Sequence, residues 1–187
     1  MVGDGRLRFL WRFDKIRNMT RPQSSEAASY YFKYIDLVPN EDVVGFLHNQ
    51  LNETMPFLES ISDEQSLYSY APDKWTIRQL LNHVNDGERI FLSRALWFAR
   101  GFTDPLPSFD QEIAVAGAKA NDTPWFQLVE EFRTVRVGTL SFFLNLPEEA
   151  WTRTGVASDN PFTVNALAYI IAGHVEHHRG VLRERYL

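Results

Sequence analysis

The most regular pattern of apolar and polar positions lies between Thr163 and Leu187. Apolar residues recur there in steps of three and four, which is the spacing of one face of an α-helix. The stripe consists of Leu167, Ile170, Ile171, His174, His178, Val181 and Leu182. Two imidazoles therefore lie on a face that should be buried. Because a buried polar ring needs hydrogen-bond partners or a ligand, this helix is the first candidate for chemistry.

The same spacing predicts two helices in the first half of the chain. One covers about residues 40–61, with Asn40 as its N-cap. The other covers about residues 76–100, where Thr76 followed by Gln79 fits a capping box. Both carry long apolar stripes, so both should contribute to a common core.

A further helix is predicted from Thr123-Pro124 to Leu146, with the threonine as N-cap and the proline at the first helical position. Residues 102–123 form a long connection with a short helix at Gln111–Lys119, and a link of this length allows the flanking helices to run parallel. Residues 148–162 are expected to be loop, because no sustained period-two alternation indicates a strand. Thr163 is expected to cap the final helix. The chain is thus predicted to be an all-α four-helix bundle with a long crossover between helices 2 and 3.

Length and composition agree with one such bundle. A chain of 187 residues is most simply one domain with a substantial core, here placed at residues 21–187. Five tryptophans and fourteen phenylalanines predict a core or cleft rich in rings. The basic, aromatic residues 1–20 are expected to form a peripheral or poorly ordered extension.

Charge and residue usage exclude several classes of protein. A formal net charge of −5 argues against nucleic acid as a partner, and the lack of cysteine excludes disulfides and cysteine nucleophiles. No apolar run approaches the roughly 18 to 20 residues that span a bilayer. The N-terminal segment lacks the apolar core and cleavage site of a secretory signal. We therefore expect a cytoplasmic protein that acts on a small molecule, without a membrane partner.

The histidines form a candidate metal site. His174 and His178 are separated by one helical turn, so their rings project from the same face and could share a divalent ion. His83 is the inward-facing candidate for a third ligand on another helix, and three histidines leave a position open, as in catalytic zinc sites. His177 could replace His178 by spacing alone, but His178 continues the apolar stripe. The competing interpretation is a set of buried, hydrogen-bonded histidines.

Other polar residues have two interpretations each. Asp86 and Arg94 follow His83 near the same helix face, and Asp86 could orient a ligand imidazole or pair with Arg89. Trp75, with its neighbour Lys74, could edge a substrate mouth or pack over the helix start. The cations at the end of the last helix, Arg179 among them, are expected to be solvated.

Several stretches resemble the DinB/YfiT-like superfamily of helical bundle proteins. They are YSYAPDKWTIRQLLNHVNDGERIF (68–91), RALWFARGFTDPLPSFDQ (94–111), EEFRTVR (130–136) and IIAGHVEHHRGVLRERYL (170–187). The resemblance implies a four-helix bundle with a long crossover and a divalent metal ion, often nickel or zinc. The matching ligand positions here are His83, His174 and His178. Many relatives carry glutamate where this chain has Val175, so no role of that glutamate is carried over.

Some proteins of this superfamily are thiol S-transferases that use bacillithiol or mycothiol. The resemblance therefore implies a metal-dependent enzyme, with S-transfer favoured and metal-dependent hydrolysis as the alternative. The thiol would be a cosubstrate, which agrees with a chain that has no cysteine. A third interpretation is a non-catalytic, metal-containing bundle that dimerises or binds a small ligand. A homodimer is also expected.

Overall fold

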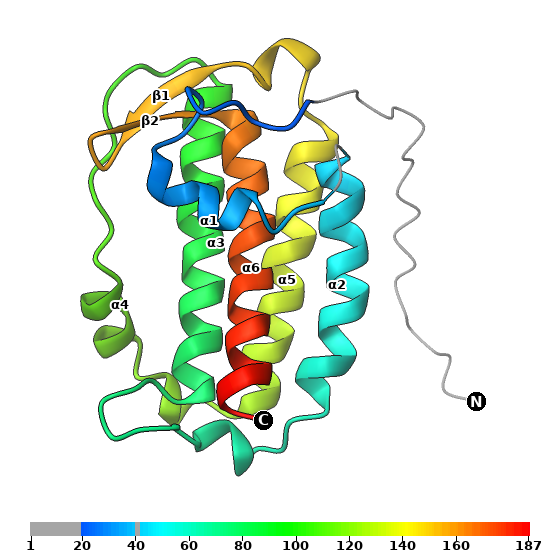
Figure 1. Cartoon of the computed structure of the whole chain (residues 1–187), viewed down its shortest axis with the longest axis vertical. Coiled ribbons are helices and arrows are strands. Elements are labelled where there is room, and N and C mark those ends of the chain that lie inside the picture. Colours follow the sequence, from blue (N-terminus) through cyan, green and yellow to red (C-terminus); the bar gives the residue numbers. More distant parts are fainter. Residues whose placement is uncertain (1–19, 40–41) are drawn as a thin grey trace.

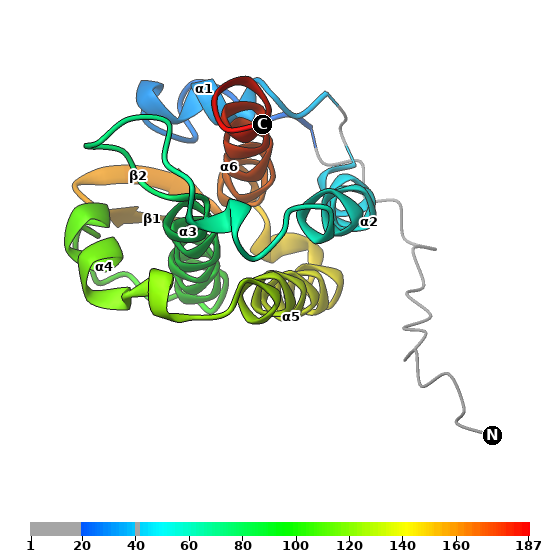
Figure 2. The ribbon, with the colours of Figure 1, turned by 90° about the horizontal axis from the view of Figure 1, so that it is seen from below.

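Four long helices dominate the computed structural model, which describes residues 20–39 and 42–187. They are α2 (Val43–Glu59), α3 (Ile77–Ala99), α5 (Trp125–Leu144) and α6 (Val164–Arg185). Seen along the helices, α3 lies between α6 and α5, while α2 closes the bundle between the same two helices (Figure 2). The predicted four-helix bundle is confirmed. In the described part of the chain, no helix is both long and apolar enough to cross a membrane.

The long connection between α3 and α5 carries the chain from one end of the bundle back to the other. It contains α4 (Gln111–Ala118) and a single 3-10 turn (Ala120–Asp122), and it lies along the outside of α3 (Figure 1). As a result α3 and α5 run in the same direction, opposite to α2 and α6. The sequence prediction of a crossover with a short helix at this place is confirmed.

Three of the four long helices begin with side-chain caps. Thr76 and Gln79 form the predicted capping box at the start of α3. The hydroxyl of Thr163 accepts a hydrogen bond from the backbone of Ala166 at the start of α6, also as predicted. At α2 the Asp42 carboxylate accepts from the backbone of Gly45, whereas the predicted cap Asn40 lies outside the described residues.

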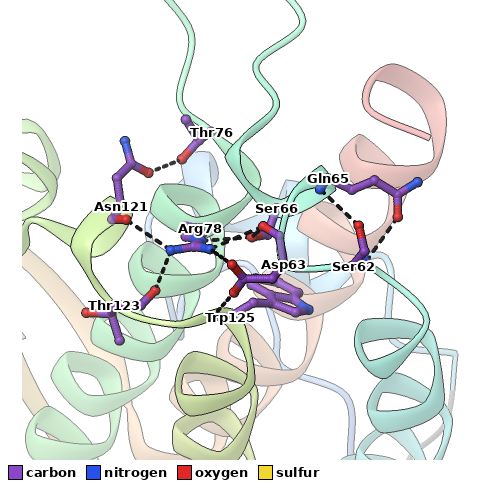
Figure 3. Close-up of polar contacts among 9 residues, drawn as sticks. All are labelled: Ser62, Asp63, Gln65, Ser66, Thr76, Arg78, Asn121, Thr123 and Trp125. Atoms are coloured by element: carbon purple, nitrogen blue, oxygen red, sulfur yellow. Dashed lines mark hydrogen bonds and ion pairs between the residues drawn. The ribbon is translucent and has the colours of Figure 1, made fainter.

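The start of α5 differs from the prediction, because Thr123 does not cap it. The Asp63 carboxylate accepts a hydrogen bond of 2.9 Å from the backbone N–H of Trp125 (Figure 3). The buried Arg78 pairs with Asp63 at 2.8 Å and donates to the carbonyl oxygen of Thr123, also at 2.8 Å. The cap therefore comes from the loop after α2, where a 3-10 turn covers Gln65–Leu67, rather than from the preceding residue.

A short antiparallel hairpin replaces part of the predicted loop at residues 148–162. After a 3-10 turn at Glu148–Ala150, β1 (Thr154–Ala157) pairs with β2 (Asn160–Thr163). Ser158 and Asp159, with φ of 51° and 59°, form the two-residue turn. The expectation of loop was wrong because four-residue strands are too short to show an alternating pattern.

The aromatic segment before α2 packs across α6, as a short helical lead-in. A 3-10 turn (Ser29–Tyr31) continues into α1 (Phe32–Ile35). Gly173 allows this close approach, since a Cβ there would lie 1.9 Å from the carbonyl oxygen of Tyr34. The contact places the Tyr34 ring beside the middle of α6.

A buried polar network joins the four long helices. Arg136 of α5 is fully buried and binds both carboxylate oxygens of Glu88 on α3, at 2.9 and 2.8 Å. It also donates to the side-chain oxygen of Gln50 on α2 at 2.6 Å. Gln50 in turn donates to Glu176 on α6 at 2.7 Å. The core is therefore held in register by charge-assisted hydrogen bonds as well as by apolar packing.

Arg179 is buried rather than solvated. Its guanidinium contacts the carboxylate of Glu176 at 2.7 Å and that of Glu53 at 3.6 Å. The expectation of an exposed cation was wrong, because α2 and α6 lie close enough here for Glu53 to reach it.

Candidate metal centre

Three histidines converge between α3 and α6. The Nε2 atom of His174 lies 3.1 Å from Nε2 of His83 and 3.1 Å from Nε2 of His178. Each residue offers one ring nitrogen, and these atoms all lie within 4.8 Å of one another. His83 and His174 are only 7% and 4% exposed. The structure thus brings together the three histidines that the sequence singled out.

Hydrogen bonding alone does not account for this arrangement. A ring nitrogen has either one hydrogen or one lone pair in the ring plane, so Nε2 of His174 cannot form two good hydrogen bonds at once. In addition, Nδ1 of His83 and Nδ1 of His178 are buried without a hydrogen-bond partner among the described residues. Nitrogens bound tetrahedrally at a Zn–N distance of about 2.0 Å lie about 3.3 Å apart, close to the observed spacing. The donor set fits a zinc or nickel ion.

Burial keeps the three imidazoles neutral. Desolvation lowers the pKa of His83 to about 4. It also lowers the pKa of His174 and of His178 well below the usual value, and repulsion between the neighbouring rings acts in the same direction. Near neutral pH each ring therefore keeps a lone pair available for a metal ion.

Aromatic rings enclose the cluster. The Trp75 ring lies 4.9 Å from that of His83, and the Tyr34 and Phe91 rings meet His174 edge-on at 5.3 and 5.9 Å. These walls restrict the access of water and lower the local dielectric constant, which strengthens electrostatic interactions at the site. Trp75 thus both packs at the start of α3 and borders the candidate site.

His177 lies outside the cluster. Its ring meets that of Tyr34 at 5.5 Å and that of His178 at 5.0 Å, in both cases edge-on. The group of converging ring nitrogens contains His178 and not His177. This placement agrees with the choice made from the apolar stripe.

Among the described residues, two cavities of about 230 Å³ each reach the cluster. We call the first the Arg94 cavity, because that arginine lines it together with His83 and His174. We call the second the Trp75 cavity, and His178 lines it. Gln111, at the start of α4, lines both. The crossover therefore supplies a wall that both cavities share.

Asp86 forms an ion pair instead of orienting a histidine. Its carboxylate lies 3.3 Å from the guanidinium of Arg89 and accepts a hydrogen bond of 2.8 Å from Asn82. The simpler of the two sequence interpretations is confirmed for this residue.

The sequence alone did not identify Tyr34, Gln111 or Ser158 as neighbours of the site. Tyr34 reaches it through the α1–α6 contact, Gln111 through the crossover and Ser158 through the hairpin turn. Each position depends on packing between segments far apart in the sequence, and no local pattern marks such packing.

Comparisons with known proteins agree with this architecture. A protein of Oceanobacillus iheyensis, whose name assigns it provisionally to the metal-dependent hydrolases, is 27% identical over 70% of this chain and 73% of its own. YfiT from Bacillus subtilis, described provisionally as a metal-dependent hydrolase with an unusual four-helix bundle topology, is similar with a TM-score of 0.66. It is 14% identical, over 87% of this chain and 91% of its own.

A mycothiol-dependent maleylpyruvate isomerase has the same fold, with a TM-score of 0.63 and 12% identity. The match covers 78% of this chain and 61% of the isomerase. At these identities the two solved structures show the fold alone. The family is shown by a sequence model, described as the DinB superfamily, that matches residues 47–182. This chain belongs to the DinB superfamily.

Proposed function

We propose that this chain is a divalent-metal-dependent enzyme that acts on a small molecule, with His83, His174 and His178 as the metal ligands. The observation that carries the proposal is the convergence of three buried, neutral imidazole nitrogens that cannot satisfy one another by hydrogen bonding. Zinc or nickel is the ion that this donor set favours. The names of the relatives, which refer to metal dependence, support the same proposal.

The protein residues have distinct roles in this proposal. The three histidines would hold the ion. A divalent ion held by three ligands would supply Lewis-acid catalysis at its remaining coordination position. Trp75 and Phe91 limit the access of water to that position. Because His83 stays neutral down to about pH 4, the ligand set keeps its lone pairs throughout the physiological range.

For the reaction itself we favour transfer that involves a low-molecular-weight thiol of the bacillithiol or mycothiol type. The Arg94 cavity borders His83 and His174, whereas the Trp75 cavity borders His178. Two compartments at one centre fit a thiol cosubstrate and a second small molecule. The mycothiol dependence of a protein with the same fold supports this choice. Hydrolysis is the second candidate, favoured by the hydrolase names of two similar proteins.

The metal proposal is tested by elemental analysis of the purified protein. We expect about one zinc or nickel ion per chain, and a large loss of bound metal in both His83→Ala and His178→Ala. His177→Ala is the matched control, since this neighbouring histidine lies outside the cluster. A wild-type protein without stoichiometric metal, combined with unchanged metal uptake in His83→Ala, would leave the non-catalytic bundle as the better interpretation.

The reaction class is tested with the metal-loaded protein. A panel of electrophiles is assayed with and without added bacillithiol or mycothiol, and a panel of esters and amides is assayed without thiol. A transferase should show no turnover of the electrophiles until the thiol is added. Turnover of an ester or amide in its absence, lost in His83→Ala, would instead identify a hydrolase.

A further inference from the structure

Arg94 is a buried cation beside the candidate metal centre. It lies on α3, is 4% exposed, and donates from Nη2 to the carbonyl oxygen of Pro107 at 3.2 Å and to Oγ of Ser158 at 2.9 Å. Both bonds use Nη2, and a guanidinium has five N–H donors in all. The Tyr31 hydroxyl also interacts with the guanidinium, and the Phe91 ring lies 5.9 Å from its central carbon. None of these partners is a carboxylate, so the contacts position the guanidinium without pairing it with an acidic side chain.

Arg94 differs in this respect from the other buried arginines of residues 20–39 and 42–187. Arg78 pairs with Asp63, Arg136 with Glu88, and Arg179 with Glu176. In the same part of the chain, no carboxylate pairs with Arg94. A buried charge without a counterion is costly, so its retention indicates an anion that is not part of this chain.

The Arg94 cavity has the composition expected of a pocket for such an anion. Its lining contains no carboxylate. The lining residues are Tyr30, Tyr31, Tyr34, His83, Gly87, Ile90, Phe91, Arg94, Phe109, Gln111, Ser158 and His174. Tyrosine hydroxyls and the Gln111 amide add hydrogen-bond donors, while the ring of Phe91 and the side chain of Ile90 supply an apolar wall. At about 230 Å³ the cavity suits a small molecule.

The cavity also connects Arg94 with the histidines. Arg94 follows His83 by eleven residues, which is close to three full turns of α3, so both side chains leave the same side of the helix. Gly87 lies between them and presents no side chain to the cavity. An occupant can therefore lie along α3, with one end at Arg94 and the other at the histidine cluster.

We propose that Arg94 binds the carboxylate of a small aryl or alkyl carboxylic acid whose opposite end lies at the three histidines. A carboxylate is favoured over a phosphate dianion, because a single guanidinium matches the planar, singly charged group. Ser158 and the Pro107 carbonyl hold the guanidinium in place. The position of the reacting end rests on the proposed function, whereas the anion site itself does not.

The test compares two probes of nearly the same shape, the charged 3-phenylpropionate and the neutral 3-phenylpropanamide. Their binding to the full chain is measured by calorimetric titration, once with one equivalent of zinc and once after removal of metal by chelation. We expect the acid to bind at least about tenfold more tightly than the amide in both states, as for a charge-assisted hydrogen bond. Equal affinities of the two probes in the wild type would overturn the proposal.

Arg94→Gln should abolish the preference for the acid, whereas Arg89→Gln should retain it. Arg89 is the matched control, since it lies on the same helix but outside the cavity and pairs with Asp86. A preference that survives Arg94→Gln contradicts the assignment. If that variant does not fold, nuclear magnetic resonance of the wild type decides. Bound 3-phenylpropionate should shift the Ser158 amide signal, and an unshifted signal rejects the site.

The two proposals fail in distinguishable ways. Loss of the acid preference with normal zinc binding would reject the carboxylate site and leave the metal centre intact. An acid preference in a chain that binds neither zinc nor nickel would retain the Arg94 site and reject the metal-dependent enzyme.

Discussion

Gly87 of α3 lies against the imidazole of His174 on α6, and a Cβ at residue 87 would come within 2.9 Å of Cε1 of that ring. The contact is shorter than carbon atoms tolerate, so any side chain at this position must displace the ring. His174 contacts both other histidines of the cluster through the same imidazole. The backbone of α3 thus determines where the central ring of the candidate metal centre can lie.

Gly87→Ala should therefore weaken zinc binding, because the methyl group displaces the His174 ring from its ligand position. The loss of a contact that orients a metal ligand typically lowers metal affinity by about tenfold or more, and we expect a similar effect here. Gly138→Ala is the control. This glycine lies within α5 and has open space at its Cβ position, so the substitution should stabilise the protein by about 0.5–1 kcal/mol without changing zinc affinity. Competition with a chromogenic chelator measures both variants, and unchanged affinity in Gly87→Ala would contradict the prediction.

The metal-free protein should lose stability between about pH 6.5 and pH 4. His83 has a pKa of about 4 when folded and 6.5 as its usual value, so the unfolded chain binds more protons in this interval. Stability therefore rises with pH across it, and the loss on acidification amounts to about 3 kcal/mol from this residue. His174 and His178, whose pKa values are also lowered, act in the same direction.

Urea unfolding in the presence of a chelator, at pH 7.5 and at pH 4.5, measures this loss. His83→Gln removes one titrating group and should flatten the dependence on pH. A variant with the same pH dependence as the wild type would show that His83 is not responsible.

Asp63→Ala should lower the melting temperature more than Glu64→Ala does. Asp63 caps α5 through the Trp125 backbone and pairs with Arg78, whereas Glu64 is an exposed neighbour (Figure 3). The N–H of Trp125, more than the charge of Arg78, lowers the pKa of Asp63 below its usual 3.8. The stabilisation is therefore complete above that pH and is lost as the pH falls through the folded-state pKa. Melting curves at pH 7 should separate the two variants, and the separation should shrink as the pH is lowered below 3.8.

Arg136→Met should destabilise the bundle by about 3–5 kcal/mol, because it leaves the buried carboxylate of Glu88 without its partner. Adding Glu88→Met should recover part of this loss by removing the stranded charge. Arg133→Met, an exposed ion-pair residue on the same helix, should cost less than about 1 kcal/mol. Urea unfolding measures all three, and similar losses for Arg136→Met and Arg133→Met would argue against the network.

Local sequence signals predicted most of the fold. Helical periodicity and the caps at Thr76 and Thr163 depend on neighbouring residues, and the structure confirms them. The cap of α5 could not be found in this way, because Asp63 is 62 residues away from Trp125. The hairpin at residues 154–163 was missed because its turn is Ser158-Asp159 rather than a stronger turn pair such as Asn-Gly.

The candidate site was predictable in part. The spacing of His174 and His178 is a property of one helix, whereas the inclusion of His83 needed its inward position on another helix and the family resemblance. The isolation of Arg94 could not be predicted, since the lack of an acidic partner depends on every segment packed around it. A homodimer and a cytoplasmic location stay predictions from the sequence.

The network around Arg136 has a consequence for the history of the family. Gln50, Glu88, Arg136 and Glu176 are joined end to end inside the bundle, so a change at one of them strands a buried donor or charge at the next. A substitution at one of these positions is therefore tolerated only when a neighbouring position changes with it. Among related chains, these four positions should therefore covary as a group, while the exposed ion pairs around Arg133 should drift independently of one another.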